Sequence, residues 1–232
     1  MLLLLQIFLI MIFTIPDALT TQELDKILYI LDEKDFVDGK TTAGWHAKLV
    51  KNNSQLKKQV SYGEDLRALV KKALKRNLAF NSAVKPKIIH SILFSRYEAG
   101  MSYGRHIDNA LMGGQDFLRS DVSLTLFLNS PSDYVGGELV IEGVDDERKV
   151  KLEAGSLIVY PSSTLHRVEK VTEGTRLVVV AWVQSLVRDP NQREILFDLD
   201  TARRSIFARE GKTVEFDLIS KSHSNLLRRW AN

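Results

Sequence analysis

Between residues 87 and 187 the chain alternates short β-branched or aromatic runs with turn residues, at intervals of roughly 8–12 residues. The separators are rich in glycine, proline, serine and aspartate, and no helical spacing of apolar residues competes with the alternation. The predicted strands cover residues 88–97, 104–109, 121–129, 138–142, 149–153, 156–160, 166–171 and 176–187. Short strands joined by tight turns are typical of a β-sandwich or a jelly-roll barrel.

The segment before this region, residues 11–86, is predicted to be mainly helical. Its first residues, 11–16, favour a short strand because they are apolar and end at a proline. Thr20 and Glu23 have the spacing of a capping box, which predicts that a helix begins there. Apolar residues at helical spacing predict a second helix over residues 54–80.

The segment after the β region, residues 188–232, is also predicted to be helical. Asp189 followed by Pro190 is typical of an N-cap and first helical position, and a last helix is expected over residues 215–230. The order of elements therefore predicts an α+β protein. In it a jelly-roll core over residues 87–187 carries helices from the N-terminal segment on its outside and ends in a C-terminal helical extension.

The chain opens with an apolar run over residues 1–13 that only Gln6 interrupts. This run is shorter than the roughly 20 residues that span a bilayer, and the first Lys or Arg is Lys26, so the basic start of a secretory signal is missing. We expect Met11 to be the natural start, or residues 1–10 to be dispensable, and the intact mass of the native protein would test this. The predicted location is the cytoplasm, and a membrane anchor is the alternative.

The net charge of +3 is unevenly distributed along the chain. Residues 46–87 contain eleven Lys and Arg against two acids, Glu64 and Asp65, whereas residues 108–173 contain twelve acids against six bases. A basic segment of this kind is most often a solvated helix face. The alternative is a nucleic-acid-binding face over residues 48–87.

The chain has no cysteine, so thiolate sites for zinc or iron–sulfur clusters are excluded, and any metal must be held by His, Asp, Glu and water. Only five histidines are available as ligands. We expect His46 and His223, in polar surroundings, to lie on the surface. His90 stands in an apolar run and is expected in the core.

His106 differs from these three because Asp108 follows it two residues later. Residues i and i+2 of a strand point to the same face, so an imidazole and a carboxylate would be presented side by side. His166 opens a later strand of the same β region. Two histidines and one carboxylate form the facial triad of non-haem Fe(II) oxygenases, although the ligand set alone does not exclude zinc.

Arg176 stands ten residues after His166, at the start of an apolar strand. An arginine in this position lies either at the rim of the barrel in water or inside it, against an anion. With a metal nearby, the second alternative predicts a bidentate clamp on a carboxylate ligand.

The set His106-x-Asp108, His166 and Arg176 within eight predicted strands resembles the Fe(II)- and 2-oxoglutarate-dependent dioxygenases of the prolyl 4-hydroxylase type, and more closely the bacterial PKHD-type hydroxylases. The resemblance covers the chain from about residue 12 to the C-terminal helices. The stretches that carry it are residues 94–109, 136–139 and 154–161 in the core, and 38–44, 51–53 and 196–202 outside it.

This resemblance implies a double-stranded β-helix, the jelly roll of that family, with Fe(2+) bound by His106, Asp108 and His166. It implies 2-oxoglutarate and O2 as cosubstrates, with Arg176 on the C5 carboxylate of 2-oxoglutarate, and L-ascorbate as a supporting reductant. Tyr97 matches a cosubstrate-contacting tyrosine, although a core aromatic is an equal alternative.

The implied reaction is hydroxylation of a peptide, protein or amino-acid side chain, coupled to decarboxylation of 2-oxoglutarate to succinate and CO2. Two alternatives are a non-catalytic jelly roll that binds a metal or ligand, and a nucleic-acid oxygenase that uses the basic face over residues 48–87. We rank nucleic acid below a peptide because no aromatic platform for stacking bases stands among those lysines. The pattern specifies neither a particular substrate nor an oligomeric state.

Overall fold

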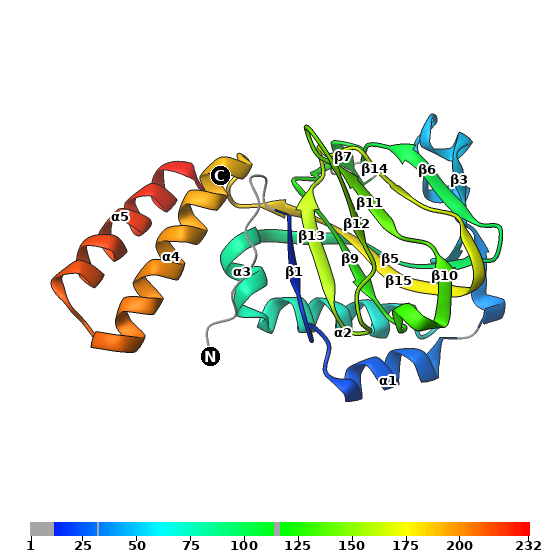
Figure 1. The fold of residues 1–232 in the computed structure, drawn as a ribbon, viewed down its shortest axis with the longest axis horizontal. Helices are drawn as coiled ribbons and strands as arrows, with labels where there is room; N and C mark the ends of the chain where they lie inside the picture. Colours follow the sequence, from blue (N-terminus) through cyan, green and yellow to red (C-terminus); the bar gives the residue numbers. More distant parts are fainter. Residues whose placement is uncertain (1–11, 32, 114–116) are drawn as a thin grey trace.

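The structure is a computed structural model that describes residues 12–31, 33–113 and 117–232. Over these ranges most strands form two sheets that stack as a sandwich (Figure 1). The larger sheet has eight strands, which are β1 (Phe13–Ile15), β13 (Leu157–Pro161), β9 (Val122–Phe127), β15 (Val171–Ser185), β5 (Pro86–Glu98), β4 (Ser54–Leu56) and β2 (Phe36–Asp38) in spatial order, with β10 (Tyr134–Gly136) on β15. The smaller sheet has the order β12 (Glu147–Val150), β11 (Leu139–Glu142), β14 (His166–Val168), β6 (Ser102–His106) and β3 (Lys51–Asn52).

All of these pairings are antiparallel, and each of the eight predicted strands has a counterpart. The prediction of an α+β fold with a jelly-roll core is therefore confirmed. Within residues 87–187, three short strands were not predicted: β10, and the hairpin of β7 (Leu111–Met112) with β8 (Leu118–Arg119). Strands of two or three residues are too short to show an alternating pattern.

The N-terminal segment contributes strands as well as helices. The strand expected over residues 11–16 is confirmed in its described part, because β1 pairs with β13 and sets Phe13 opposite Val159. The extension over residues 1–10 lies outside the described residues. Strands β2, β3 and β4 extend the edges of both sheets, so this segment is part of the sandwich as well as its cover.

The prediction of one continuous helix over residues 54–80 is wrong at its first residues and at Asn77. Its first residues form β4, which pairs with the edge of β5, because a partner distant in sequence outweighs a weak local preference. The helix proper, α2 (Gly63–Arg76), ends where Asn77 leaves the helical conformation. The Asn77 side chain then accepts a bond of 2.9 Å from the amide of Phe80 and starts α3 (Leu78–Val84), as a capping asparagine does.

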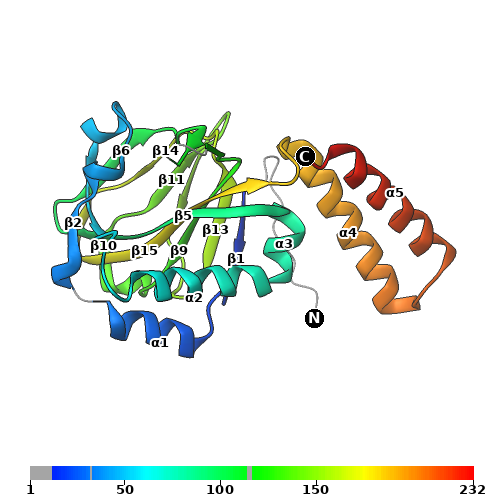
Figure 2. The same ribbon diagram turned by 180° about the vertical axis from the view of Figure 1, so that it is seen from behind.

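Helices α1 (Thr21–Ile30) and α2 lie along one side of the sandwich (Figures 1 and 2). The capping box of α1 is confirmed, since Glu23 N donates to Thr20 Oγ1 at 3.2 Å and Thr20 N donates to the Glu23 carboxylate at 3.0 Å. The core under these helices joins the buried face of α2 and α3 to the larger sheet; its members include Ile27, Leu66, Val70, Leu74, Phe80, Phe94 and Leu124.

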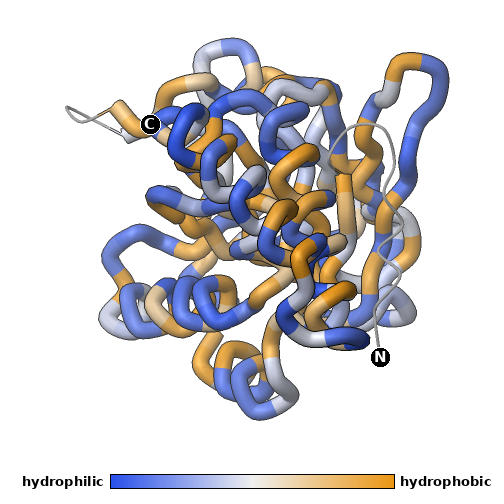
Figure 3. Tube along the Cα trace, turned by 90° about the vertical axis from the view of Figure 1, so that its left-hand side faces the viewer, coloured by the Kyte–Doolittle hydropathy of each residue, from blue (hydrophilic) through white to orange (hydrophobic). Residues whose placement is uncertain are grey.

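A second core lies between the two sheets. Its buried members include Tyr97, Phe127, Tyr134, Leu139, Ile158 and Val178. In Figure 3 hydrophobic and hydrophilic segments alternate along the chain, and many of the hydrophilic segments lie at the periphery.

The C-terminal helices α4 (Pro190–Glu210) and α5 (Val214–Trp230) form an antiparallel pair that projects from the sandwich beside α3 (Figure 1). Asp189 caps α4 as predicted, accepting from Gln192 N at 3.0 Å. Asp200 connects the pair to α3, because its carboxylate accepts from Ser82 Oγ at 2.6 Å.

The prediction that His223 lies on the surface is wrong. His223 is only 7% exposed in α5, and its burial lowers the pKa of the imidazole. Across the described ranges, no helix has both the length and the apolar character needed to cross a bilayer.

Phe80 tests the core beneath the helices. It is fully buried, so Phe80→Ala is expected to lower the free energy of unfolding by about 3–5 kcal/mol, because transfer free energy is lost and a cavity remains. Leu78→Ala, at an exposed position of the same helix, should stay within about 0.5 kcal/mol. Equal losses in urea unfolding would contradict this packing.

Candidate metal centre

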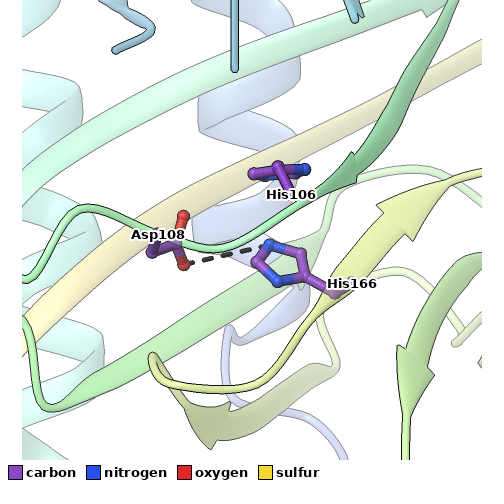
Figure 4. A group of neighbouring side chains, drawn as sticks. All are labelled: His106, Asp108 and His166. Carbon is purple, nitrogen blue, oxygen red and sulfur yellow. Dashed lines mark ion pairs between the residues drawn. The ribbon is translucent and has the colours of Figure 1, made fainter. Parts of the chain in front are cut away.

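His106, Asp108 and His166 meet at one point between the sheets (Figure 4). His106 is the last residue of β6 and His166 the first of β14, and the pairing of these strands sets the two histidines directly opposite each other. Asp108 was predicted in the same strand as His106, but it lies two residues beyond the end of β6. Its carboxylate nevertheless turns toward the imidazoles, so the predicted grouping is present although the predicted strand is too long.

One ligand atom from each of the three side chains lies within 4.8 Å of the others. His166 Nε2 and Asp108 Oδ2 are 3.8 Å apart, and the imidazole centroids of His106 and His166 are 4.3 Å apart. Separations of this size leave room for one ion bound to all three groups.

Main-chain carbonyls orient both imidazoles. His106 Nδ1 donates to the carbonyl of Gly104 at 2.8 Å, and His166 Nδ1 donates to that of Thr164 at 3.0 Å. A carbonyl can only accept, so Nδ1 carries the proton and Nε2 keeps its lone pair for a metal.

Asp108 is held by a hydroxyl. Ser123 Oγ, on β9, donates to Asp108 Oδ2 at 2.6 Å and is bonded in turn to Ser162 Oγ at 2.8 Å. The bond restrains the carboxylate, which is nearly inaccessible to solvent. Sequence reasoning missed Ser123, because nothing in its neighbourhood along the chain marks it as a partner of Asp108.

Burial and the nearby imidazole of His166 together lower the pKa of His106 to about 4. His106 is therefore neutral at pH 7 and available as a ligand. Two imidazoles and a carboxylate bind borderline divalent ions and leave further coordination positions open, which fits the facial triad of Fe(II) oxygenases.

Arg176 is 1% exposed, which excludes the position at the rim of the barrel. Its guanidinium carbon lies 5.0 Å from the ring centroid of Tyr97 and 5.5 Å from that of Phe127. Among the described residues, none forms a hydrogen bond with Arg176 Nε or Nη1. A buried guanidinium with unused donors is costly unless an anion completes it, so this site fits a carboxylate.

Gly137 gives Arg176 the space it needs. It has a φ of +68°, and a Cβ placed there would lie 3.1 Å from Arg176 Cδ and 2.9 Å from Val171 Cγ2. A side chain at this position would therefore push against the stem of the arginine as well as strain the backbone.

Tyr97 lies opposite Arg176 in the pairing of β5 with β15, with its ring buried. Burial raises the pKa of its hydroxyl, and the charge of Arg176 partly offsets this. The hydroxyl is thus protonated at neutral pH and able to donate a bond.

One cavity of about 790 Å³ is lined by His106, Asp108, His166, Arg176 and Tyr97. Its size is in the upper part of the range for pockets that enclose a small organic molecule. The cavity therefore combines a candidate three-ligand metal centre with a candidate anion site.

The remaining histidines take no part in this cluster. His90 is buried in β5, as expected for a core histidine. His46 is half-buried and packs edge-on against Trp45.

Two family models match the chain. The 2OG-Fe(II) oxygenase superfamily matches residues 92–184, and the PKHD-type hydroxylase C-terminal domain matches residues 191–232. A PKHD-type hydroxylase of Rippkaea orientalis is 64% identical over 220 residues, which cover 95% of this chain and 99% of the relative. Another, of Gloeothece citriformis, is 65% identical over 222 residues and covers 95% and 100%.

A solved structure gives the same fold. The crystal structure of a Pseudomonas putida prolyl-4-hydroxylase superposes with a TM-score of 0.52 at 20% identity, covering 76% of this chain and 94% of that one. At this identity the likeness concerns the arrangement of strands and helices.

Ser123→Ala tests the support of the carboxylate ligand. Loss of a group that orients a metal ligand is expected to weaken Fe(II) affinity by about 10–100-fold, because Asp108 can then rotate away from the imidazoles. Anaerobic titration of the metal-free protein with Fe(II) measures this. Ser61→Ala, on the surface, is the control, and an unchanged affinity in Ser123→Ala would contradict the role of the bond.

Proposed function

The chain belongs to the PKHD-type hydroxylases of the 2-oxoglutarate- and Fe(II)-dependent oxygenase superfamily, and we propose that it hydroxylates a peptide, protein or amino-acid side chain. The reaction is coupled to the decarboxylation of 2-oxoglutarate to succinate and CO2. The observation that carries this proposal is the buried guanidinium of Arg176, which has unused donors in the same cavity as the two histidines and the aspartate.

In this proposal His106, Asp108 and His166 would hold Fe(II) within the cavity. Bound together, Fe(II) and 2-oxoglutarate supply the activation of O2 and the transfer of one oxygen atom to a C–H bond of the substrate. Arg176 pairs with the C5 carboxylate of 2-oxoglutarate, and Tyr97 offers its hydroxyl to the same molecule. These two residues fix the orientation of the cosubstrate relative to the metal ligands.

Apolar and aromatic side chains line the cavity beside the metal ligands. They are Leu139 and Val168 from the smaller sheet, and Tyr160 and Val180 from the larger. In the proposed reaction these walls limit the contact of water with a reactive oxidant and so reduce side reactions.

Exposed apolar side chains at the rim of the cavity favour a polypeptide substrate. Ile107 and Leu111 line the cavity and yet are 42% and 55% exposed, and Trp45, next to the cavity-lining Gly44, is 79% exposed. Apolar side chains gathered around an opening favour contact with an apolar segment of another chain.

The basic face over residues 48–87 gives less support to a nucleic-acid substrate. Lys57 and Lys58 are exposed at the cavity, whereas Lys51, which also lines it, and Lys85 are buried. Arg67 and Arg76 are paired with Glu64 and Glu23. The remaining lysines of α2 stand on a helix that packs on the outside of the larger sheet, whereas the metal centre lies between the sheets.

We also place this activity in the cytoplasm, where cellular reductants maintain a reducing environment. L-Ascorbate fits the same scheme as a reductant that returns oxidised iron to the ferrous state. Succinate release should therefore fall when ascorbate is omitted from an aerobic assay.

The first test of the proposed function is Fe(II)-dependent release of succinate from 2-oxoglutarate. His106→Ala and Asp108→Ala are each expected to abolish it, because two ligands do not retain the metal. His46→Ala, at a half-buried histidine outside the cluster, is the matched control. Metal binding by the wild-type protein without 2-oxoglutarate consumption would instead support a non-catalytic binding module.

Arg176→Gln tests the cosubstrate site. A charge-assisted pair contributes about 1.5–3 kcal/mol, so the KM for 2-oxoglutarate is expected to rise by roughly tenfold or more. Arg176→Lys should recover part of the loss, because it restores the charge without the fork of donors. The control is Arg96→Gln, since Arg96 precedes Tyr97 in β5 but pairs with Glu33 and Glu98. An unchanged KM in Arg176→Gln would remove Arg176 from this role.

A further inference from the structure

Lys51 is a buried cation that neither the metal centre nor the Arg176 site uses. It lies in β3 opposite Tyr103 of β6 and is 5% exposed. Its Nζ donates to Thr42 Oγ1 at 3.0 Å and lies 5.2 Å from the centroid of the Tyr103 ring. Within the described part of the chain no carboxylate comes within ion-pair distance of this ammonium.

Lys51 lines the same cavity as the metal ligands. An ammonium has three N–H donors, and the hydroxyl of Thr42 accepts only one, so donors remain for a ligand. Tyr103 itself stacks on the imidazole of His106, with 3.6 Å between centroids, which places Lys51 on the side of the cavity that carries His106.

Asn53 provides a second unsatisfied polar group two residues further on. It is 3% exposed, lines the same cavity, and neither its Oδ1 nor its Nδ2 has a hydrogen-bond partner among the described residues. Its main-chain carbonyl accepts from Gly39 N at 2.8 Å, and a Cβ at Gly39 would collide with the Asn53 side chain. The backbone at Gly39 therefore packs closely against the Asn53 side chain, and the amide of that side chain forms no hydrogen bond with the described residues.

The charges in the cavity show what kind of ligand is missing. Among the buried charges of the cavity, the carboxylate of Asp108 and both carboxylates of 2-oxoglutarate would balance Fe(II) and Arg176. Lys51 would then remain as a buried cation with no carboxylate at ion-pair distance among the described residues, which is unfavourable unless an anion is present. Neither of the molecules assigned so far supplies it.

We propose that Lys51, with Asn53 beside it, forms a binding subsite for a carboxylate of the primary substrate. The inference rests on the proposed function and adds a substrate class to it: a molecule with an anionic group close to the C–H bond that is hydroxylated. The carboxylate of an amino acid at a chain terminus and an acidic side chain both have this chemistry.

The charge state of Lys51 is compatible with this role. Burial lowers the pKa of Lys51 to about 8, while the charges of Asp108 and Asp38 act in the opposite direction. The ammonium is therefore still mostly protonated at neutral pH.

The experiment compares two probes that differ only in charge, N-acetylglycine and N-acetylglycinamide. Each is titrated anaerobically into the complete Fe(II)- and 2-oxoglutarate-loaded protein and followed by tryptophan fluorescence, because Trp182 lines the cavity. Binding of 2-oxoglutarate is measured separately, from the charge-transfer absorption of its complex with Fe(II). The variants are Lys51→Met and Lys51→Arg, with Lys48→Met at a nearby exposed lysine as the control.

The wild-type protein and Lys48→Met are expected to bind the acid at least about tenfold more tightly than the amide, as a charged hydrogen bond allows. Lys51→Met should remove this preference and leave 2-oxoglutarate affinity within twofold, and Lys51→Arg should retain the preference.

Three results would overturn the inference. The first is no preference for the acid in the wild-type protein, including the case in which neither probe binds. The second is a preference that survives Lys51→Met, which would mean that a group other than Lys51 binds the acid. The third is a tenfold loss of 2-oxoglutarate affinity in Lys51→Met, which would assign Lys51 to the cosubstrate. Failure of the proposed function is distinct, because the charge-transfer absorption would then be missing from the wild-type protein.

Discussion

The antiparallel pairing of β6 with β14 determines the geometry of the metal centre, because it sets His106 opposite His166. Side chains alternate between the two faces of a strand, so a slip of one residue would turn one imidazole away from the other. The pairing is central in the smaller sheet, with β11 and β3 on either side, and these neighbours restrain its register. The buried surface between the sheets therefore stabilises the ligand geometry as well as the fold.

The two sheets supply different residues to the site. The smaller sheet supplies the two histidines, and the larger sheet supplies Arg176, Tyr97 and the serine that holds Asp108. The proposed cosubstrate and metal positions thus meet only when the sheets are packed together. Lys51, on the edge strand of the smaller sheet, brings a further cation to the same space.

Alternating patterns made the strands of the sandwich predictable, and the His-x-Asp spacing with a later histidine made the grouping of His106, Asp108 and His166 predictable. The strand β4 was not predictable, because it is defined by its pairing with β5, some forty residues further along the chain, and not by its own sequence. Ser123 and Lys51 were missed for the same reason: their nearness to the metal ligands exists only in the folded chain. His223 was misplaced because polar neighbours in sequence did not reveal that its side of α5 is covered.

The imidazoles are oriented by carbonyls that belong to the residues two positions before them, Gly104 and Thr164. Every amino acid carries such a carbonyl, so the choice of side chain at those positions cannot abolish the acceptor. The tautomer of each histidine therefore depends on the course of the backbone and not on the side chains two positions earlier. Asp108 differs, because the group that orients it is the side chain of Ser123. A single substitution at position 123 can therefore remove the support of the carboxylate, whereas substitutions at positions 104 and 164 leave the carbonyls that orient the imidazoles.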